Sequence, residues 1–140
     1  MELTKIKYDD LNAKQREIYN FQKLAAVLAD YGFNCIKLTD DWLGADFLAY
    51  HKDGEFSYRV QLKGRLTINK KYENKKLYMA FPVGNDWCVI KHDCLVNLVG
   101  KNTNWLQTKS WQDKGLYHSA KPSQPLLRAI SDKVIKAEKV

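Results

Sequence analysis

Three polar residues in the first half of the chain have a spacing that could serve chemistry: Asp46, Gln61 and Lys63. Asp46 opens one run of strand-forming residues, and Gln61 and Lys63 close the next run. Alternate residues of a strand point to the same side, so Gln61 and Lys63 project together. A hairpin would bring the end of the second run beside the start of the first. The three side chains are therefore expected to meet.

Such a set is suited to hydrolysing a phosphodiester. Carboxylate and amide oxygens are ligands of hard divalent cations, so Asp46 and Gln61 are expected to hold Mg²⁺, with Mn²⁺ as the alternative ion. A bound metal ion lowers the pKa of its water and offsets charge on phosphoryl oxygens. Lys63 is expected to orient that water and to stabilise the charge of the transition state. Glu17 would add a carboxylate if the helix that carries it packs against the hairpin.

The elements that must position these residues follow from periodicity. A helix is expected over residues 12–31, with Asn12 as its N-cap and Gly32 just beyond its end. Its apolar side chains recur at steps of three and four residues; they are Ile18, Phe21, Leu24, Ala25 and Leu28. Glu17 precedes Phe21 by four residues, which places it on or beside that apolar face.

After Gly32 the pattern changes to that of strands. The expected strands are residues 33–38, 46–50, 56–63, 77–81 and 87–90. Residues 39–44 are expected to form a polar turn, and Asp53-Gly54 is typical of a tight hairpin turn. A short helix is expected over 93–99 and a closing helix over 125–136, whereas 100–124 gives no clear pattern. Helix, strands and helix predict one α/β domain over residues 1–140, with a mixed sheet flanked by helices.

The charge of the chain favours a polyanionic partner. The formal net charge is +7 and the isoelectric point is near 9.3. Directly after Lys63 comes a basic segment that we expect to contact the phosphates of a nucleic acid; its cations are Arg65, Lys70, Lys71, Lys75 and Lys76. The alternative is a solvated loop whose charges repel one another.

The segments Gly44-Ala45-Asp46 and Arg59-Val60-Gln61-Leu62-Lys63 resemble the PD-(D/E)XK nuclease superfamily. In that resemblance Asp46 matches the family's aspartate, Gln61 its acidic position and Lys63 its lysine. Glu17 matches the acid that many members carry on the first helix. The Gln-x-Lys pair is most similar to members such as group I intron-associated homing endonucleases. Ala45 stands where the motif has proline, and the resemblance covers residues 12 to about 91.

The resemblance implies a restriction-endonuclease-like fold and a metal-dependent endonuclease that cuts double-stranded DNA, leaving a 5′-phosphate and a 3′-hydroxyl. Since cutting both strands usually takes two sites, a homo-oligomer, dimer or tetramer, is expected. Two alternatives stay open. One is a non-catalytic or inhibitory module on the same fold, which the neutral Gln61 favours. The other is a basic nucleic-acid-binding domain whose hairpin residues are structural.

The remaining chemistry-bearing residues favour structural roles. Cys88, His92 and Cys94 do not match zinc-finger spacing, so we expect core cysteines and a surface histidine. The aromatic residues of the unpatterned stretch are expected to anchor it rather than to stack on bases; they are Trp105, Trp111 and Tyr117. The odd cysteine number, the lack of a secretory signal and the lack of a membrane-spanning stretch predict a cytoplasmic protein with no membrane partner.

Overall fold

The computed structural model describes residues 1–137, and its first long element is helix α1, Ala13–Ala29. Asn12 caps it as predicted: its side chain accepts from the Gln15 N–H, and the Gln15 side chain accepts from the Asn12 N–H, both at 2.9 Å. Gly32 follows with φ 87°, a left-handed backbone that favours glycine. Leu24 and Leu28 turn inward as predicted, but Ile18 is 43% exposed because this end of the helix extends beyond the sheet.

A mixed six-stranded sheet forms the centre of the molecule, in the order β1-β2-β3-β5-β6-β8. Its strands are β1 Phe33–Trp42, β2 Ala45–His51, β3 Ser57–Leu62, β5 Leu77–Val83, β6 Asp86–Lys91 and β8 Val134–Ile135. β3 and β5 pair in parallel, and the other neighbours pair antiparallel. The predicted α/β class, with a mixed sheet flanked by helices, is confirmed.

Two segments take a different form from that predicted, whereas the other predicted strands differ from the observed ones by only one or two residues at their ends. Residues 39–44 do not form a simple turn, because β1 continues to Trp42 through a register shift between Lys37 and Trp42. The closing helix is also shorter than residues 125–136. Helix α3, Gln124–Ala129, gives way to the short 3₁₀ helix η5, Ser131–Lys133, and then to β8. Val134 and Ile135 are β-branched residues that pair with Cys88 and Trp87 of β6, so sheet pairing prevails over the helical pattern.

Residues 66–72 and 92–129 build a layer that the sequence only partly predicts. Helix α2, His92–Asn102, includes the expected helix at 93–99. Strands β4, Leu66–Asn69, and β7, Leu116–Ser119, form a small antiparallel sheet that was not predicted. Short helical turns complete the layer; they are η2 Lys70–Tyr72, η3 Trp105–Gln107 and η4 Ser110–Lys114.

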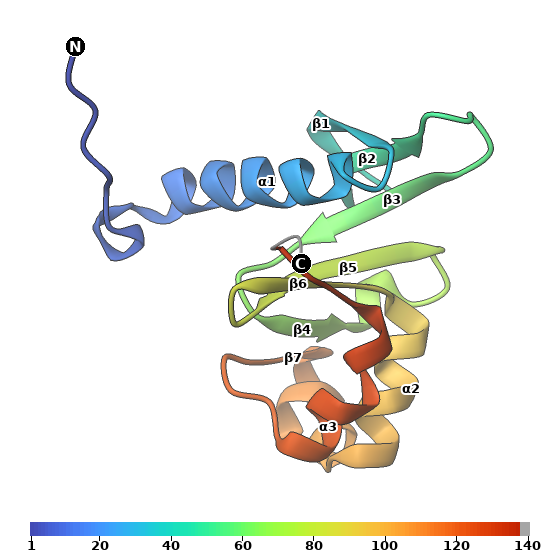
Figure 1. The fold of residues 1–140 in the computed structure, drawn as a ribbon. Helices are drawn as coiled ribbons and strands as arrows, with labels where there is room; N and C mark the ends of the chain where they lie inside the picture. The colour runs from blue at the N-terminus through green and yellow to red at the C-terminus, as the bar shows by residue number, and fades with distance from the viewer. Residues whose placement is uncertain (138–140) are drawn as a thin grey trace.

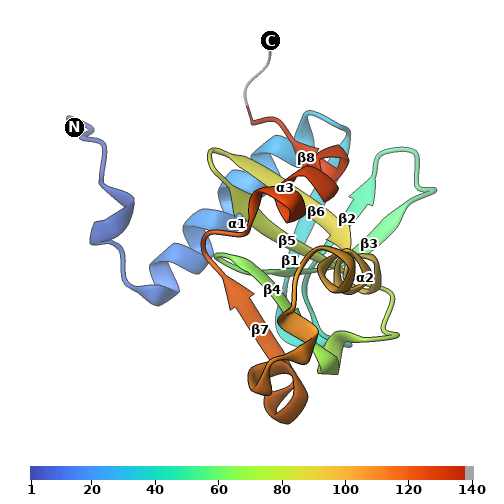
Figure 2. The same cartoon turned by 90° about the horizontal axis from the view of Figure 1, so that it is seen from below.

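Apolar side chains pack in two clusters, one on each side of the central sheet. Figure 1 shows α1 on one side of β5 and β6, with β4, β7, α2 and α3 on the other, and Figure 2 shows the same arrangement from below. Leu24 and Leu28 of α1 pack on Phe47 and Val60. On the opposite side, Trp105 and Trp111 are buried, and Trp105 stacks on Tyr117 at 4.4 Å. These aromatic residues therefore anchor the segment after residue 100.

Within residues 1–137 no helix has both the length and the apolar character that crossing a membrane requires.

Candidate functional site

The β2–β3 hairpin brings Asp46 to the end of β3. Phe47 pairs with Val60, so one residue further along in the same register Asp46 comes opposite Gln61. The Leu62 N–H donates to the Asp46 carboxylate, at 3.3 Å from Oδ1 and 3.2 Å from Oδ2. The two strands are joined by the predicted turn, in which the Gly54 N–H donates to the His51 carbonyl at 2.9 Å. The hairpin thus fixes the carboxylate beside the Gln-x-Lys pair.

All four predicted site residues line one cleft of about 400 Å³. Glu17 comes from α1, Asp46 from the start of β2, and Gln61 and Lys63 from the end of β3. The cleft also takes in polar residues that the sequence analysis did not single out; they are Lys14, Asn20, Lys37, Thr39, Asp40 and Asp41. The structure therefore gathers the predicted set and adds charges of both signs around it.

The pKa of the Asp46 carboxyl group is shifted by influences of opposite sign. Burial raises its pKa from 3.8 to about 6, because a charge is poorly solvated there, and the nearby Asp41 raises it further. The Leu62 N–H, Lys37 and Lys63 act in the opposite direction by favouring the ionised form. At neutral pH the group is ionised at a cost in free energy, which a bound cation would reduce.

Gln61 carries the most informative atom of the cleft. Its side chain is only 7% exposed, and its Oε1 is buried without a hydrogen-bond partner among the described residues. Leaving a buried carbonyl oxygen unpartnered costs about 1–3 kcal/mol. A hard cation accepts carboxylate and amide oxygens as ligands, so Asp46 and Gln61 fit Mg²⁺. Among residues 1–137, however, no three His, Cys, Asp or Glu side chains gather into a group that could hold a metal.

The other two predicted residues have different settings. Lys63 is half-buried, and its N–H donates to the Ala80 carbonyl of β5 at 2.9 Å, which fixes the main chain from which its side chain extends. Glu17 is exposed at the rim of the cleft, where its Oε2 lies 3.6 Å from the Lys14 Nζ. An exposed pair of this kind contributes little to stability.

The predicted phosphate-binding segment lies outside this cleft. Arg65 lines a neighbouring cleft of about 420 Å³ that meets the first at Gly64. Lys70 and Lys71 lie over the rings of Trp111 and Tyr72, at 5.4 and 5.2 Å. Lys75 and Lys76 are exposed and do not line the Asp46 cleft. The cations that do line it are Lys14, Lys37 and Lys63.

The segment is also not a solvated loop. Its apolar residues Leu66, Ile68 and Tyr72 are buried, and they form β4 and η2. Lys70 and Lys71, which lie between Ile68 and Tyr72, are exposed residues of this packed segment.

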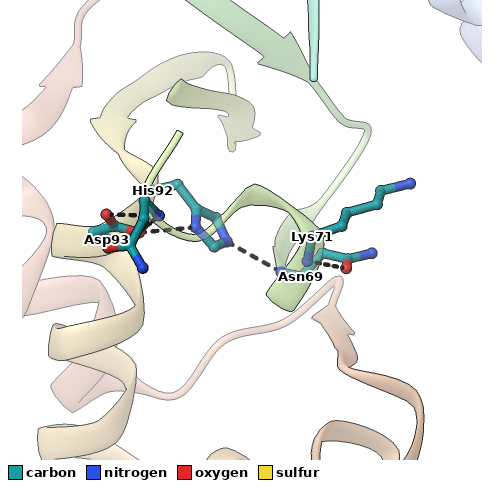
Figure 3. Close-up of polar contacts among 5 residues, drawn as sticks. Asn69, Lys71, His92 and Asp93 are labelled. Atoms are coloured by element: carbon teal, nitrogen blue, oxygen red, sulfur yellow. Dashed lines mark hydrogen bonds and ion pairs between the residues drawn. The ribbon is translucent and has the colours of Figure 1, made fainter. Parts of the chain in front are cut away.

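A second polar cluster surrounds His92 at the start of α2 (Figure 3). The prediction of a surface histidine is wrong: His92 is fully buried, and its Nε2 accepts from the Asn69 N–H at 3.1 Å. Its Nδ1 faces Asp93 Oδ1 at 3.5 Å. Cys88 is a core residue as expected, with burial raising its thiol pKa to about 12, whereas Cys94 is exposed.

Comparison of the chain with family models, with curated proteins and with solved structures found no match. The resemblance to PD-(D/E)XK nucleases therefore stays a prediction from the sequence.

Proposed function

We propose that this chain is a Mg²⁺-dependent endonuclease of the PD-(D/E)XK type that hydrolyses phosphodiester bonds in double-stranded DNA. The observation that carries the proposal is the Asp46 carboxylate at the end of the strand that holds Gln61, whose buried Oε1 has no partner among the described residues. A cleft with these two oxygens and the Lys63 ammonium has the groups that phosphodiester hydrolysis needs.

Each residue has a separate task in this proposal. Asp46 and Gln61 hold the divalent cation, Mg²⁺ or Mn²⁺, which when bound lowers the pKa of a water and offsets phosphoryl charge. Lys63 orients the attacking water and stabilises the negative charge that develops on the phosphoryl oxygens. Glu17, at the rim of the cleft, provides an additional carboxylate that assists the reaction. Hydrolysis gives a 5′-phosphate and a 3′-hydroxyl.

The substrate class is supported by charge. The whole chain carries +7, and Lys14, Lys37 and Lys63 surround the cleft. Contacts between such cations and phosphates predict an affinity for DNA that falls steeply as salt rises. Cutting both strands of a duplex calls for two sites, so the proposal includes a homo-oligomer, a dimer or a tetramer, in a cytoplasmic setting.

A non-catalytic nucleic-acid-binding or inhibitory module is the second candidate. The observation that favours it is the neutral Gln61, because an amide contributes no negative charge to a cation site. In that case DNA binding would persist without a metal ion, and Lys63 would act only as a phosphate contact.

The test is cleavage of supercoiled plasmid in Mg²⁺, Mn²⁺ or EDTA by the parent and by Lys63→Ala. Lys52→Ala is the matched control, because Lys52 is an exposed lysine at the β2–β3 turn that does not line the cleft. We expect metal-dependent nicking that falls at least about 100-fold in Lys63→Ala and is unchanged in Lys52→Ala. DNA binding in EDTA, together with no cleavage of any plasmid or genomic DNA by the parent, would establish the binding module instead.

A further inference from the structure

The irregular end of β1 brings two more carboxylates into the Asp46 cleft. Regular pairing with β2 stops at Lys37 and resumes only at Trp42, and the intervening residues Asp40 and Asp41 line the cleft. The hairpin between β1 and β2 then turns through Gly44, with φ 88°.

The tight turn holds this segment in place. A Cβ at Gly44 would lie 3.1 Å from Leu77 Cδ2 and 3.2 Å from Tyr72 Cδ1, both in buried side chains. The turn is therefore pressed against the core, and the segment that leads into it is anchored at both ends. A carboxylate on such a segment has a defined position relative to β2.

The two aspartates are not equivalent with respect to Asp46. The charge of Asp41 raises the pKa of both Asp46 and Tyr72, whereas Asp40 is not among the groups that shift either. The strand register gives the reason: Trp42 pairs with Ala45, so Asp41 and Asp46 are the residues next to that pair on the two strands, and Asp40 lies one residue further away. Asp40 lines the same cleft without that effect.

The cleft contains a signal for a ligand that does not depend on these acids. Gln61 is more than nine-tenths buried and its Oε1 has no partner among residues 1–137. Asp46 and Gln61 together offer a divalent cation only one negative charge. A second carboxylate would balance the ion's charge. In the metal-free protein the charge of Asp41 opposes the ionisation of Asp46.

We propose that Asp41 is a second carboxylate ligand of the divalent cation that Asp46 and Gln61 bind. The inference rests on the proposed function, since it concerns the same cleft. Gln61 of β3 is neutral, and in this proposal Asp41 of β1 supplies the second negative charge instead. Asp41 thus belongs to the metal site, and Asp40 to its rim.

The experiment is direct titration of the metal-free protein with Mn²⁺, followed by the loss of the free-ion electron paramagnetic resonance signal. We expect Asp41→Asn to weaken Mn²⁺ binding at least about tenfold and Asp41→Glu to recover part of it. Asp40→Asn removes the same charge from the same cleft and is expected to change binding less than about threefold. Circular dichroism of each variant verifies that it is folded.

The possible results separate the two proposals. Equal Mn²⁺ affinity in the parent and in folded Asp41→Asn, with weaker binding in Asp46→Asn, would overturn the assignment of Asp41 and leave the proposed function standing. Equal losses in Asp41→Asn and Asp40→Asn would also overturn it, because general charge would then explain both. A parent that binds no Mn²⁺ would count against the proposed function itself.

Discussion

The Asp46 cleft and the His92 cluster each bury one side-chain atom that has no hydrogen bond among the described residues, Gln61 Oε1 and His92 Nδ1, yet the two atoms differ in their surroundings. Around His92 the other polar atoms are paired. Nε2 accepts from the Asn69 N–H (Figure 3), and the Asp93 carboxylate accepts from the Asn74 N–H at 3.2 and 3.1 Å. His92 Nδ1 itself lies 3.5 Å from Asp93 Oδ1. In the cleft, Leu62 donates to Asp46, but Gln61 Oε1 has no partner among the described residues.

The two regions show how a structural polar cluster can be distinguished from a binding site. The His92 cluster ties β4 and the residues after η2 to the start of α2, so its polar atoms serve the fold. Burial also lowers the pKa of His92, but its Nδ1 faces the Asp93 carboxylate, which favours the charged ring. In the cleft, Gln61 Oε1 has no partner among residues 1–137 and the pKa of Asp46 is raised, and both of these oppose folding. Such costs are expected where a ligand supplies the missing interactions. Substitutions should therefore act on binding in one region and on stability in the other.

The largest effect is expected for Asp46→Asn. If the proposed metal site is correct, removing the charge of this ligand lowers the rate of metal-dependent cleavage at least about 1000-fold. The same change should raise the free energy of unfolding at pH 7.5, because the variant no longer buries an ionised carboxylate. Plasmid cleavage and urea unfolding in EDTA measure the two effects. A variant that is both inactive and less stable than the parent would contradict the comparison.

His92→Ala should lower the stability of the protein and leave metal binding unchanged. It removes a buried ring that contacts Tyr72 edge-on at 5.6 Å and leaves the Asn69 N–H without its acceptor. We expect a loss of about 2–4 kcal/mol in the free energy of unfolding, with unchanged Mn²⁺ affinity in the protein that stays folded. Urea unfolding and Mn²⁺ titration at low temperature measure these quantities. A stable variant with weaker Mn²⁺ binding would place His92 in the site.

The smallest effect is a difference in pH dependence between the two regions. The pKa of Asp46 is raised to about 6, so its contribution to stability is present below about pH 4 and is lost as pH rises through 6. Burial lowers the pKa of His92, so its contribution is present above pH 6.5 and is lost as pH falls through the lowered pKa. The two slopes have opposite signs.

Single variants should separate these slopes. Between pH 4 and 6 in EDTA, we expect Asp46→Asn to make the free energy of unfolding rise more with pH than it does in the parent, by roughly 1–2 kcal/mol. His92→Gln should make it rise less. Urea unfolding at three pH values measures how the free energy of unfolding of each variant depends on pH. If both substitutions change this dependence in the same direction, the raised pKa of Asp46 or the lowered pKa of His92 is wrong.

The sequence predicted the part of the site that depends on local rules. Asp46, Gln61 and Lys63 belong to a short hairpin, where strand alternation and a tight turn fix which side chains meet. Glu17 reaches the cleft because α1 has a clear cap and apolar stripe. Asp41 was missed because nothing local shows that residues 39–42 extend β1 through a register shift.

Long-range pairing explains the other errors. Val134 and Ile135 continue the helical spacing of Leu126, Leu127 and Ile130, and only the free edge of β6 makes them a strand. Residues 65–76 looked like a basic loop, although the apolar residues between the cations pair with β7 and enter the core. In both places the partner strand lies 40 or more residues away, beyond any local pattern.

The single parallel pairing among the described strands, β3 with β5, also bears on how the molecule folds. β1, β2 and β3 follow one another through short turns, and local pairing of this kind forms fast. β5 pairs with β3 only after a crossover through β4 and η2. Asp41, Asp46, Gln61 and Lys63 all lie before that crossover. The contacts that set these residues relative to one another are thus close in sequence, whereas the pairing of Gln61 with Met79 of β5 spans the crossover.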